Sequence, residues 1–329
     1  MKKVKAVGLL SGGLDSTLAA KMVLDQGIDV VALNFTSPFC TCSREGRCES
    51  AEAAEHLGIE LKAMPKGDDY IHVIRNPKHG YGKNMNPCID CRIYILKKAK
   101  DFAKEIGADF IFTGEVLDQR PKSQHRRALE IIERESGLKG KLLRPLSAKL
   151  LAETEVEKKG LIDRKKLGDM HGRSRKRQME MADDINLVDY HCAGGGCLLT
   201  EKRIAKRVRD FLDHNADAKM RDMWLLKYGR HFRVGENKII VGRDEGENKK
   251  LLAFKKENDF VFEIKGVGSP IVVLQGRKGK KAIEMAARLA ARYSDAKGEE
   301  VIVGYLAGKK HHKIRVSPAR REEIEKYLI

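Results

Sequence analysis

Cysteines are the residues of this chain whose type and spacing point most directly to chemistry. The stretch "NPCIDCR" places Cys88 and Cys91 at C-x-x-C spacing where a long helical pattern begins, and "HCAGGGCLLT" places Cys192 and Cys197 on either side of a glycine run. A helix start stabilises thiolates, so the first pair could act as nucleophiles or bind a metal ion or the edge of a cluster. The two pairs together could also form a four-thiolate zinc site. Burial as small side chains is the simplest alternative for the C-x-x-C pair.

A second stretch, "SGGLDS" at residues 11–16, has the composition of a phosphate-binding turn. It follows the apolar run "VKAVGLL" and leads into a helical pattern, so it lies where a strand gives way to a helix. Glycines let the backbone approach a ligand closely, and free N–H groups at a helix start favour an anion. A tight turn with a serine cap would explain "SGG" alone, but the longer stretch is more specific. It lacks the Gly-Lys-Ser/Thr ending of a Walker loop, so γ-phosphate transfer of that kind is not indicated.

Alternating strands and helices are predicted to position these residues. The predicted strands cover 4–10, 29–35, 59–65 and 109–115, and the predicted helices cover 16–26, 49–58 and 91–107. Several of the helical patterns are closed by glycine, which commonly ends a helix. This alternation favours an α/β fold with a doubly wound parallel sheet, in which ligands bind beyond the carboxyl ends of the strands.

The pattern changes near residue 200, which divides the chain into two predicted domains, 1–200 and 201–329. A chain of 329 residues is long enough for two domains with sizeable cores. After a basic amphipathic helix at 201–214, β-prone runs broken by glycines precede a further helix at 280–295. We therefore expect a smaller α+β domain after the parallel-sheet domain.

The net charge of +18 predicts a polyanionic partner, either nucleic acid or an anionic membrane surface. No uninterrupted apolar run approaches the roughly 18 residues that a membrane span needs. The apolar segment after the basic N-terminus is too short for the core of a signal peptide, and seven cysteines without an export signal do not suggest a disulfide framework. We therefore expect a cytoplasmic protein, with nucleic acid rather than a membrane as its partner.

Basic segments at 122–127 and 164–177 are the first candidates for contact with a phosphate backbone. A solvated charged surface is the simplest alternative for such runs. A third basic segment, "GKKHHKIR", lies near the C-terminus. The residues predicted to bind RNA are Arg126, Arg127, Arg173, Arg175, Lys176, Arg177, Lys309 and Lys310.

The "SGGLDS" stretch resembles the PP-loop signature of the ATP pyrophosphatase superfamily. Members of that superfamily cleave ATP between the α- and β-phosphates and use AMP to activate a carbonyl oxygen. The resemblance implies that the turn cradles pyrophosphate, that Asp15 organises it with Mg²⁺, that "LNF" borders the adenine and that "TGE" closes the pocket. Glu115 stands where related thiolases have histidine. The residues implied to bind ATP are Ser11, Gly12, Gly13, Asp15, Ser16, Asn34, Phe35 and Gly114.

The "NPCIDC" stretch is similar to the cysteine segment of tRNA thiouridine synthetases within that superfamily. Some members use a catalytic persulfide and a resolving cysteine, and others hold a 4Fe–4S cluster on three cysteines. The resemblance favours a cluster on Cys88, Cys91 and Cys197, with Cys192 as the alternative third ligand and zinc as the alternative metal. In the persulfide version Cys91 or Cys197 carries the sulfur. Asp15, Cys91 and Cys197 are therefore the expected catalytic residues.

Three further cysteines follow the second predicted strand. Cys40 and Cys42 could face the nucleotide as auxiliary sulfur carriers, or could form a second metal site with Cys48. Otherwise they are ordinary loop residues.

The second half resembles the RNA-binding domain of the NFACT family over residues 231–317, through "IIVGRDEGENKKL", "GSPIVVLQG" and "AARLAARYS". A domain that only supports the first is the alternative. Together the resemblances imply an ATP-dependent tRNA sulfurtransferase, which adenylates a uracil carbonyl and inserts sulfur from a cluster-bound sulfide or a cysteine persulfide. The sulfur donor would be free sulfide or a persulfide carrier. The alternatives are a PP-loop enzyme that adenylates a small molecule and has a structural zinc site, and a non-catalytic RNA-binding protein.

Overall fold

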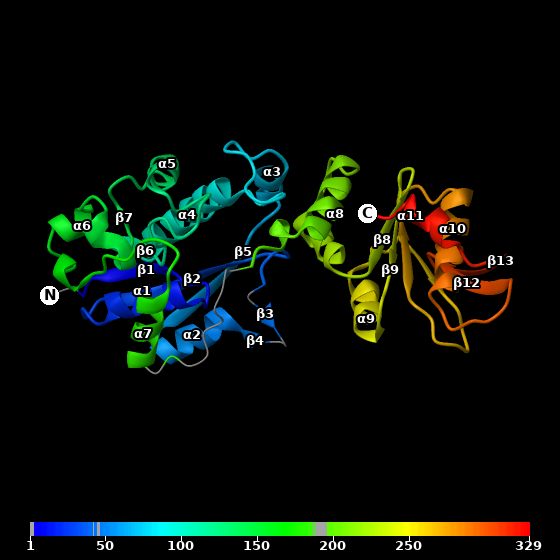
Figure 1. The fold of residues 1–329 in the computed structure, drawn as a ribbon, viewed down its shortest axis with the longest axis horizontal. Coiled ribbons are helices and arrows are strands. Elements are labelled where there is room, and N and C mark those ends of the chain that lie inside the picture. The colour runs from blue at the N-terminus through cyan, green and yellow to red at the C-terminus, as the bar shows by residue number, and fades with distance from the viewer. Residues whose placement is uncertain (1–2, 42, 45–46, 186, 188–195) are drawn as a thin grey trace. The chain divides into compact units, whose positions relative to one another are not determined.

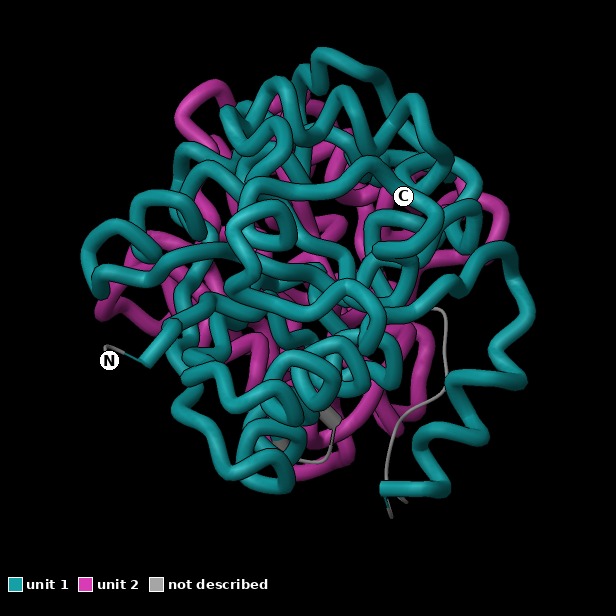
Figure 2. The backbone as a smooth tube through the Cα atoms, turned by 90° about the vertical axis from the view of Figure 1, so that its left-hand side faces the viewer, with its two compact units in different colours: residues 1–201 teal, residues 202–329 magenta. Residues whose placement is uncertain are grey.

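The structure is a computed structural model, which describes residues 3–41, 43–44, 47–185, 187 and 196–329. The chain forms two compact units, residues 1–201 and 202–329, which Figure 2 draws in different colours. Each unit has its own sheet and hydrophobic core. In the described ranges no helix is both long enough and apolar enough to cross a membrane.

The first unit is built around a parallel five-stranded sheet with the strand order β5-β2-β1-β6-β7 (Figure 1). Its strands are β1 (Lys5–Leu9), β2 (Asp29–Thr36), β5 (Glu60–Pro65), β6 (Phe110–Thr113) and β7 (Leu142–Leu143), and β3 (Ser43–Arg44) pairs separately with β4 (Arg47–Cys48). Its helices are α1 (Leu14–Leu24), α2 (Glu49–Leu57), α3 (Tyr70–Arg75), α4 (Cys88–Glu105), α5 (Arg126–Ser136), α6 (Glu155–Lys158) and α7 (Lys176–Asp184), with shorter 3-10 turns at η1 (Pro145–Leu150), η2 (Arg164–Lys166) and η3 (Leu198–Thr200). The predicted doubly wound α/β fold is confirmed.

Helices cover both faces of this sheet (Figure 1). On one face α1 and α7 pack over a core that includes Ala6 and Phe112, and on the other α4 and α5 pack over a core that includes Val7 and Leu96. Successive strand residues point to opposite faces, so Ala6 and Val7 belong to different cores. Because both faces are buried, the central strands are apolar throughout rather than alternating.

The order of the strands changes direction at β1. From β1 the chain moves outward to β2 and β5, and it then returns to add β6 and β7 on the other side of β1. Connections that leave two neighbouring strands in opposite directions open a crevice beyond the carboxyl ends of those strands. In this unit the crevice lies between the segments that follow Leu9 and Thr113.

The second unit contains an antiparallel six-stranded sheet with the order β13-β12-β10-β11-β9-β8. Its strands are β8 (Arg230–Val234), β9 (Asn237–Val241), β10 (Phe260–Glu263), β11 (Val272–Gln275), β12 (Val301–Ala307) and β13 (Lys310–Val316), and its helices are α8 (Lys202–Asp213), η4 (Met220–Lys227), α9 (Glu245–Phe254), α10 (Lys280–Arg292) and α11 (Arg321–Glu325). α10 packs over the main core, while Leu225 and Leu251 contribute to a smaller core with Ile240 and Val273. The predicted α+β architecture is confirmed.

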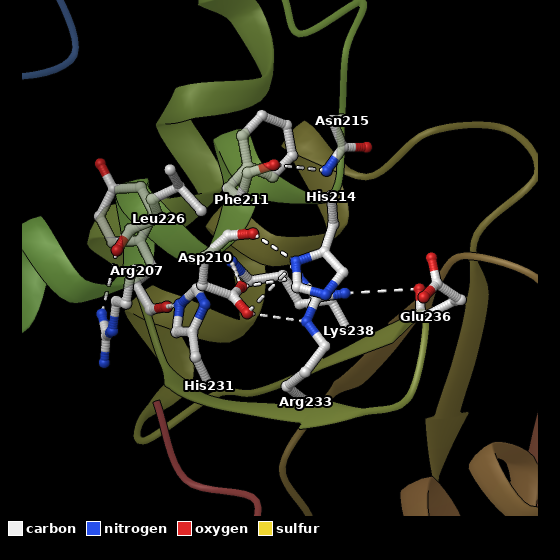
Figure 3. A network of polar contacts seen from close by, with 11 residues as sticks. Arg207, Asp210, Phe211, His214, Asn215, Leu226, His231, Arg233, Glu236 and Lys238 are labelled. Atoms are coloured by element: carbon white, nitrogen blue, oxygen red, sulfur yellow. Dashed lines mark hydrogen bonds and ion pairs between the residues drawn. The ribbon is translucent and has the colours of Figure 1, made fainter. Parts of the chain in front are cut away.

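A buried polar network joins α8 to β8 and β9 in this unit (Figure 3). Asp210 accepts two hydrogen bonds from the guanidinium of Arg233, at 2.8 and 2.6 Å, and lies 3.3 Å from Nζ of Lys238. Only 3% of the Lys238 side chain is exposed. Burial lowers the pKa of Lys238 to about 7; Asp210 opposes this shift and the charge of Arg233 adds to it.

The free energy of unfolding is expected to rise with pH above about 7 through Lys238. The unfolded chain keeps this proton up to the ordinary lysine pKa of 10.5, whereas the folded protein releases it near 7, so unfolding takes up a proton between these values. One such group contributes a slope of at most about 1.4 kcal/mol per pH unit. Urea unfolding of a Lys238→Met variant, in which Arg233 still pairs with Asp210, should lack this slope. An exposed control, Lys281→Met, should keep it, and equal slopes in the two variants would contradict the assignment.

Candidate functional site

The turn between β1 and α1 is held by hydrogen bonds among its own residues. The N–H of Ser11 donates to Oγ of Ser16 at 3.2 Å, and that hydroxyl donates to the carbonyl of Gly13 at 2.8 Å. The hydroxyl of Thr17 donates to the same carbonyl at 3.2 Å. These bonds fix the start of α1, where backbone N–H groups lack helical partners, at the crevice of the sheet.

Two glycines allow this turn to pack closely. Gly12 has a φ of 81°, and a Cβ atom there would lie 2.3 Å from the backbone carbon of Glu49. A Cβ atom at Gly114, in the segment after β6, would lie 2.5 Å from Cα of Ser16. The segments after β1 and β6 therefore touch through their backbones, which only glycine at position 114 permits.

A Gly12→Ala variant is expected to have a lower Tm than the wild type, whereas Gly13→Ala should be nearly neutral. Alanine at position 12 would combine a positive φ with a backbone clash, and strain of this kind costs about 1–3 kcal/mol. At position 13 the nearest atom to a new Cβ is Oγ of Ser11, at an ordinary 3.5 Å. Thermal unfolding of the two variants side by side tests this, and equal Tm values would contradict it.

A cavity of about 250 Å³ opens at the crevice. Its walls come from the turn after β1, the end of β2 and the segment after β6, so it lies at the carboxyl ends of three neighbouring strands. The predicted ATP-binding residues that line it are Ser11, Gly13, Asp15, Ser16, Asn34, Phe35 and Gly114. Gly12 belongs to the same turn.

Three arginines face this cavity from different elements: Arg92 from α4, Arg120 from the segment after β6, and Arg175 from the residue before α7. Burial lowers the pKa of Arg120, and the charges of Arg92 and Arg175 lower it further, while Asp15 opposes them. Like charges held this close favour a bound polyanion. Sequence reasoning missed Arg92 and Arg120. The one signal in the sequence that could have identified Arg92 is its position directly after Cys91. Arg175, predicted to contact RNA, lies at this cavity.

Asp15 is oriented by side chains from distant parts of the first unit. Nε2 of Gln119 donates to its Oδ2 at 2.6 Å, and Nε2 of Gln178, on α7, lies 3.5 Å from its Oδ1. Gln178 also donates to Oε1 of Gln119 at 3.1 Å, and Arg175 lies 3.9 Å from the carboxylate. The two glutamines were not predicted from the sequence, because nothing in their local pattern distinguishes them.

Asn34 presents an unsatisfied acceptor at the cavity. Its Nδ2 donates to the carbonyl of Leu10 at 2.7 Å, but its buried Oδ1 accepts no hydrogen bond from any residue that the structure describes. A buried acceptor without a donor costs about 1–3 kcal/mol. A ligand with an N–H group at this position would remove that cost.

Glu115 is part of a buried ion-pair network. Its carboxylate, 1% exposed, lies 3.0 Å from Nε of Arg144 and 3.5 Å from Nε of Arg92. Burial raises the pKa of Glu115, but Arg144 and Arg92 outweigh burial, so the pKa lies below its usual value. The carboxylate therefore stays charged and holds Arg92 at the cavity wall.

A cluster of thiols surrounds Lys66, which follows β5. Nζ of Lys66 lies 3.3 Å from Sγ of Cys91 and 4.4 Å from the ring centre of Tyr70. Burial lowers the pKa of Lys66, but the neighbouring sulfurs, Cys91 foremost and then Cys40 and Cys197, outweigh it, so the net pKa is raised. Cys91, Cys197 and Cys40 therefore all lie near Lys66. Cys40 also lines the cavity, whereas the sulfur of Cys48 contacts Oγ of Ser50 at 3.1 Å.

Two of the predicted ligand thiols are held in the protonated form. Burial, together with the nearby Cys91, raises the pKa of Cys88, and burial raises the pKa of Cys197 to about 12. At Cys88, burial therefore outweighs the expected benefit of the helix start. Such thiols bind a metal by exchanging their protons for it. Within the described residues no three His, Cys, Asp or Glu side chains are grouped to hold one metal ion, and Cys42 and Cys192 lie outside those residues.

The remaining residues predicted to bind RNA are not among those that line the cavity. They are exposed side chains: Arg126 and Arg127 on the first turn of α5, Arg173, Lys176 and Arg177 around the start of α7, and Lys309 and Lys310 at the turn between β12 and β13. Arg177 pairs with Asp169 at 2.7 Å. Exposure of this kind suits contact with a phosphate backbone.

Comparison with known families agrees with this geometry. Residues 2–152 match the family model described as "Thiamine biosynthesis protein (ThiI)", and residues 229–328 match the one described as "NFACT protein RNA binding domain". The first unit is therefore an α/β unit that is similar to the ThiI family over residues 2–152. More particularly, this segment is similar to tRNA-specific 2-thiouridylases, and the second unit is similar to the NFACT RNA-binding domain over residues 229–328.

Individual relatives match over limited segments. A tRNA-specific 2-thiouridylase MnmA from Methylobacillus flagellatus is 34% identical over 134 residues, which cover 37% of this chain and 37% of that protein. The protein of the same name from Pelobacter propionicus is 30% identical over 117 residues, covering 34% of this chain and 33% of that protein. The chain thus spans about a third of the length of these relatives. The solved U34-tRNA thiolase NcsA from Methanococcus maripaludis, with its 4Fe–4S cluster, shares 18% identity over 65% of this chain and 66% of its own, at a TM-score of 0.34.

Proposed function

We propose that this protein is an ATP-dependent sulfurtransferase that converts a uridine of RNA, expected to be tRNA, into a thiouridine. The observation that supports this most is that the same cavity is lined by the phosphate-binding turn and by segments that carry the cysteines. The PP-loop turn lines one side of it, and Cys40, Arg92 and Gly196 line another. Arg92 follows Cys91 and Gly196 precedes Cys197, so a bound nucleotide and a sulfur carrier would lie within reach of one another.

The proposed reaction has two steps. A uracil carbonyl oxygen attacks the α-phosphorus of ATP, and pyrophosphate leaves. Sulfur then attacks the activated carbon, and AMP departs with the original oxygen. The protein has to hold the triphosphate, neutralise the charge of the leaving pyrophosphate and present sulfur to the base.

The phosphate-binding part of this proposal rests on the turn and the arginines. The start of α1 would bind the phosphates, and Arg92, Arg120 and Arg175 would neutralise them. The adenine amino group is a suitable donor for Oδ1 of Asn34. Asp15 supplies the carboxylate that Mg²⁺ prefers, and it would hold that ion beside the phosphates.

The sulfur chemistry centres on Cys91. Cys88, Cys91 and Cys197 are soft thiol donors that suit a 4Fe–4S cluster, which would supply bound sulfide when present. In the persulfide version Cys91 carries the sulfur and Cys197 lies near it. In either version Lys66 sets a positive charge against Cys91, and the buried hydroxyl of Tyr70 hydrogen-bonds with the same sulfur.

The RNA would be bound by both units. We propose that residues 1–200 carry out adenylation and thiolation and that residues 201–329, with Lys309 and Lys310, bind RNA. The exposed arginines on α5 and near α7 would contact the phosphate backbone. A stacked base has to be flipped out before its carbonyl can reach the cavity. We place this activity in the cytoplasm, with free sulfide or a persulfide carrier as the sulfur donor.

The test uses the full chain with ATP labelled at the α-phosphate, unmodified tRNA and sulfide. We expect AMP to form only when RNA is present, and thiouridine to appear in digests of that RNA by mass spectrometry. Asp15→Asn should abolish both products, whereas Asp25→Asn, at an exposed position after α1, should preserve them. AMP formation that does not need RNA would favour adenylation of a small molecule. RNA binding without any AMP would favour a non-catalytic role.

A further inference from the structure

Cys40 and Cys197 face each other across a short antiparallel bridge in the first unit. The N–H of Leu198 donates to the carbonyl of Phe39 at 2.9 Å, and the N–H of Thr41 donates to the carbonyl of Gly196 at 3.2 Å. These two bonds flank the cysteines, so the cysteines form a non-hydrogen-bonded antiparallel pair. In such a pair the Cα atoms are about 4.5 Å apart and the side chains lie on the same face, close together.

This register meets the distance requirement for a disulfide, because bridged cysteines have Cα atoms about 4.4–6.8 Å apart. We propose that Cys40 and Cys197 form a reversible cross-strand disulfide, which removes Cys197 from the thiol cluster around Lys66. Cys91 belongs to the same cluster around Lys66, but it lies on α4 and is not part of this bridge, and Cys48 contacts Ser50. No sequence motif connects Cys40 with Cys197, so only the fold reveals the pair.

Cys40 is the member of the pair that lines the cavity, so an oxidant would meet it first. Cys40, Thr41 and Gly196 line that cavity, and Oγ1 of Thr41 donates to the carbonyl of Gly196 at 2.9 Å, which keeps the two segments together. The oxidant we propose is a low-molecular-weight disulfide such as oxidised glutathione. The sulfur of Cys40 attacks it and releases one thiolate, which leaves a mixed disulfide on Cys40. The sulfur of Cys197 then attacks the sulfur of Cys40 and releases the second thiolate; the two cysteine protons pass to the released thiolates.

The disulfide would be incompatible with the use of Cys197 as a cluster ligand or sulfur carrier. Its effect on RNA thiolation therefore rests on the proposed function, whereas its formation does not. A nucleotide in the cavity would also cover the route to Cys40 and slow the reaction.

The experiment uses the full chain, freed of metal by a chelator under anaerobic conditions and then treated with oxidised glutathione. After alkylation and digestion with trypsin without reductant, we expect a cross-link between peptides 22–44 and 178–202, with the mass of two hydrogens lost. Each peptide contains a second cysteine, Cys42 or Cys192, which provides a matched control. The cross-link should persist in Cys42→Ser and Cys192→Ser and be lost in Cys40→Ser and Cys197→Ser.

A cross-link from Cys197 to Cys91 instead of Cys40, or one that is lost in Cys42→Ser, would overturn the proposal. So would a Cys40 that stays free while the other thiols oxidise. Added ATP should slow the cross-link. If the Cys40–Cys197 bond forms equally fast with ATP, the nucleotide site of the proposed function is contradicted while the disulfide site is supported, so the two failures can be told apart.

Discussion

Replacement of Cys91 by alanine is expected to abolish thiouridine formation while RNA-dependent conversion of ATP to AMP continues. The ammonium group of Lys66 lies 3.3 Å from the sulfur of Cys91, and the hydroxyl of Tyr70 interacts with the same sulfur. The phosphates, by contrast, would be held by the turn after β1 and by the arginines. Loss of a group that delivers the attacking atom typically costs a factor of more than about 10³. Thiouridine in digested RNA and labelled AMP, measured in the same reaction, test the separation of the two steps.

Cys48→Ala is the matched control for this variant. The sulfur of Cys48 contacts the hydroxyl of Ser50, and Cys48 does not line the cavity. Both products should therefore persist in this variant. Thiouridine formed by Cys91→Ala at a rate near that of the wild type would show that another residue delivers the sulfur. Loss of AMP together with thiouridine would show that Cys91 supports the nucleotide site instead.

Arg144→Met is expected to lower the free energy of unfolding of the first unit by about 3–5 kcal/mol. The guanidinium of Arg144 is 1% exposed and pairs with Glu115 at 3.0 Å and also with Glu133. Its removal leaves the carboxylate of Glu115 buried with only the more distant Arg92 opposite it. A buried charge that has lost its main partner is among the most destabilising changes that one substitution can make. Denaturant unfolding, followed by a signal from the first unit, measures the loss.

A double variant separates this explanation from simple loss of packing. When Glu115→Gln accompanies Arg144→Met the buried charge is removed, so we expect much of the stability to return. Arg127→Met, at an exposed position on α5, should change stability by less than about 0.5 kcal/mol. Equal losses in the single and double variants would indicate that Arg144 stabilises the unit through packing alone.

The parts of the site that sequence reasoning reached are those with local causes. "SGGLDS" predicts a strand-to-helix turn because its glycines and serines act on their own neighbours, and the structure has β1, this turn and α1 in that order. The apolar runs likewise predicted β1, β2, β5 and β6 of the parallel sheet, but not β7. The C-x-x-C pair predicted a helix start, and α4 begins at Cys88. Its burial, which raises the pKa of Cys88, depends on surroundings that the sequence does not display.

The parts that it missed depend on contacts between distant segments. Cys40 meets Cys197 because the chain after β2 and the chain before η3 are brought together by the finished sheet. Arg144 reaches Glu115 only because the two-residue strand β7, too short for a recognisable pattern, pairs with β6. Arg175 belongs to a charged run that reads as a surface, yet α7 packs on α1 and brings it to Asp15.

The central position of β1 has a consequence for the synthesis of the protein. β1 leaves the ribosome long before its neighbour β6, which begins at Phe110, and the cavity wall also needs Arg175 and Gly196. A nascent chain therefore cannot close the cavity until nearly all of the first unit has been translated. Because domains tend to fold as units during translation, the site would be completed while the second unit is still being made. A nucleotide bound in the cavity, as proposed, would then stabilise the newly closed first unit by mass action before the second unit exists.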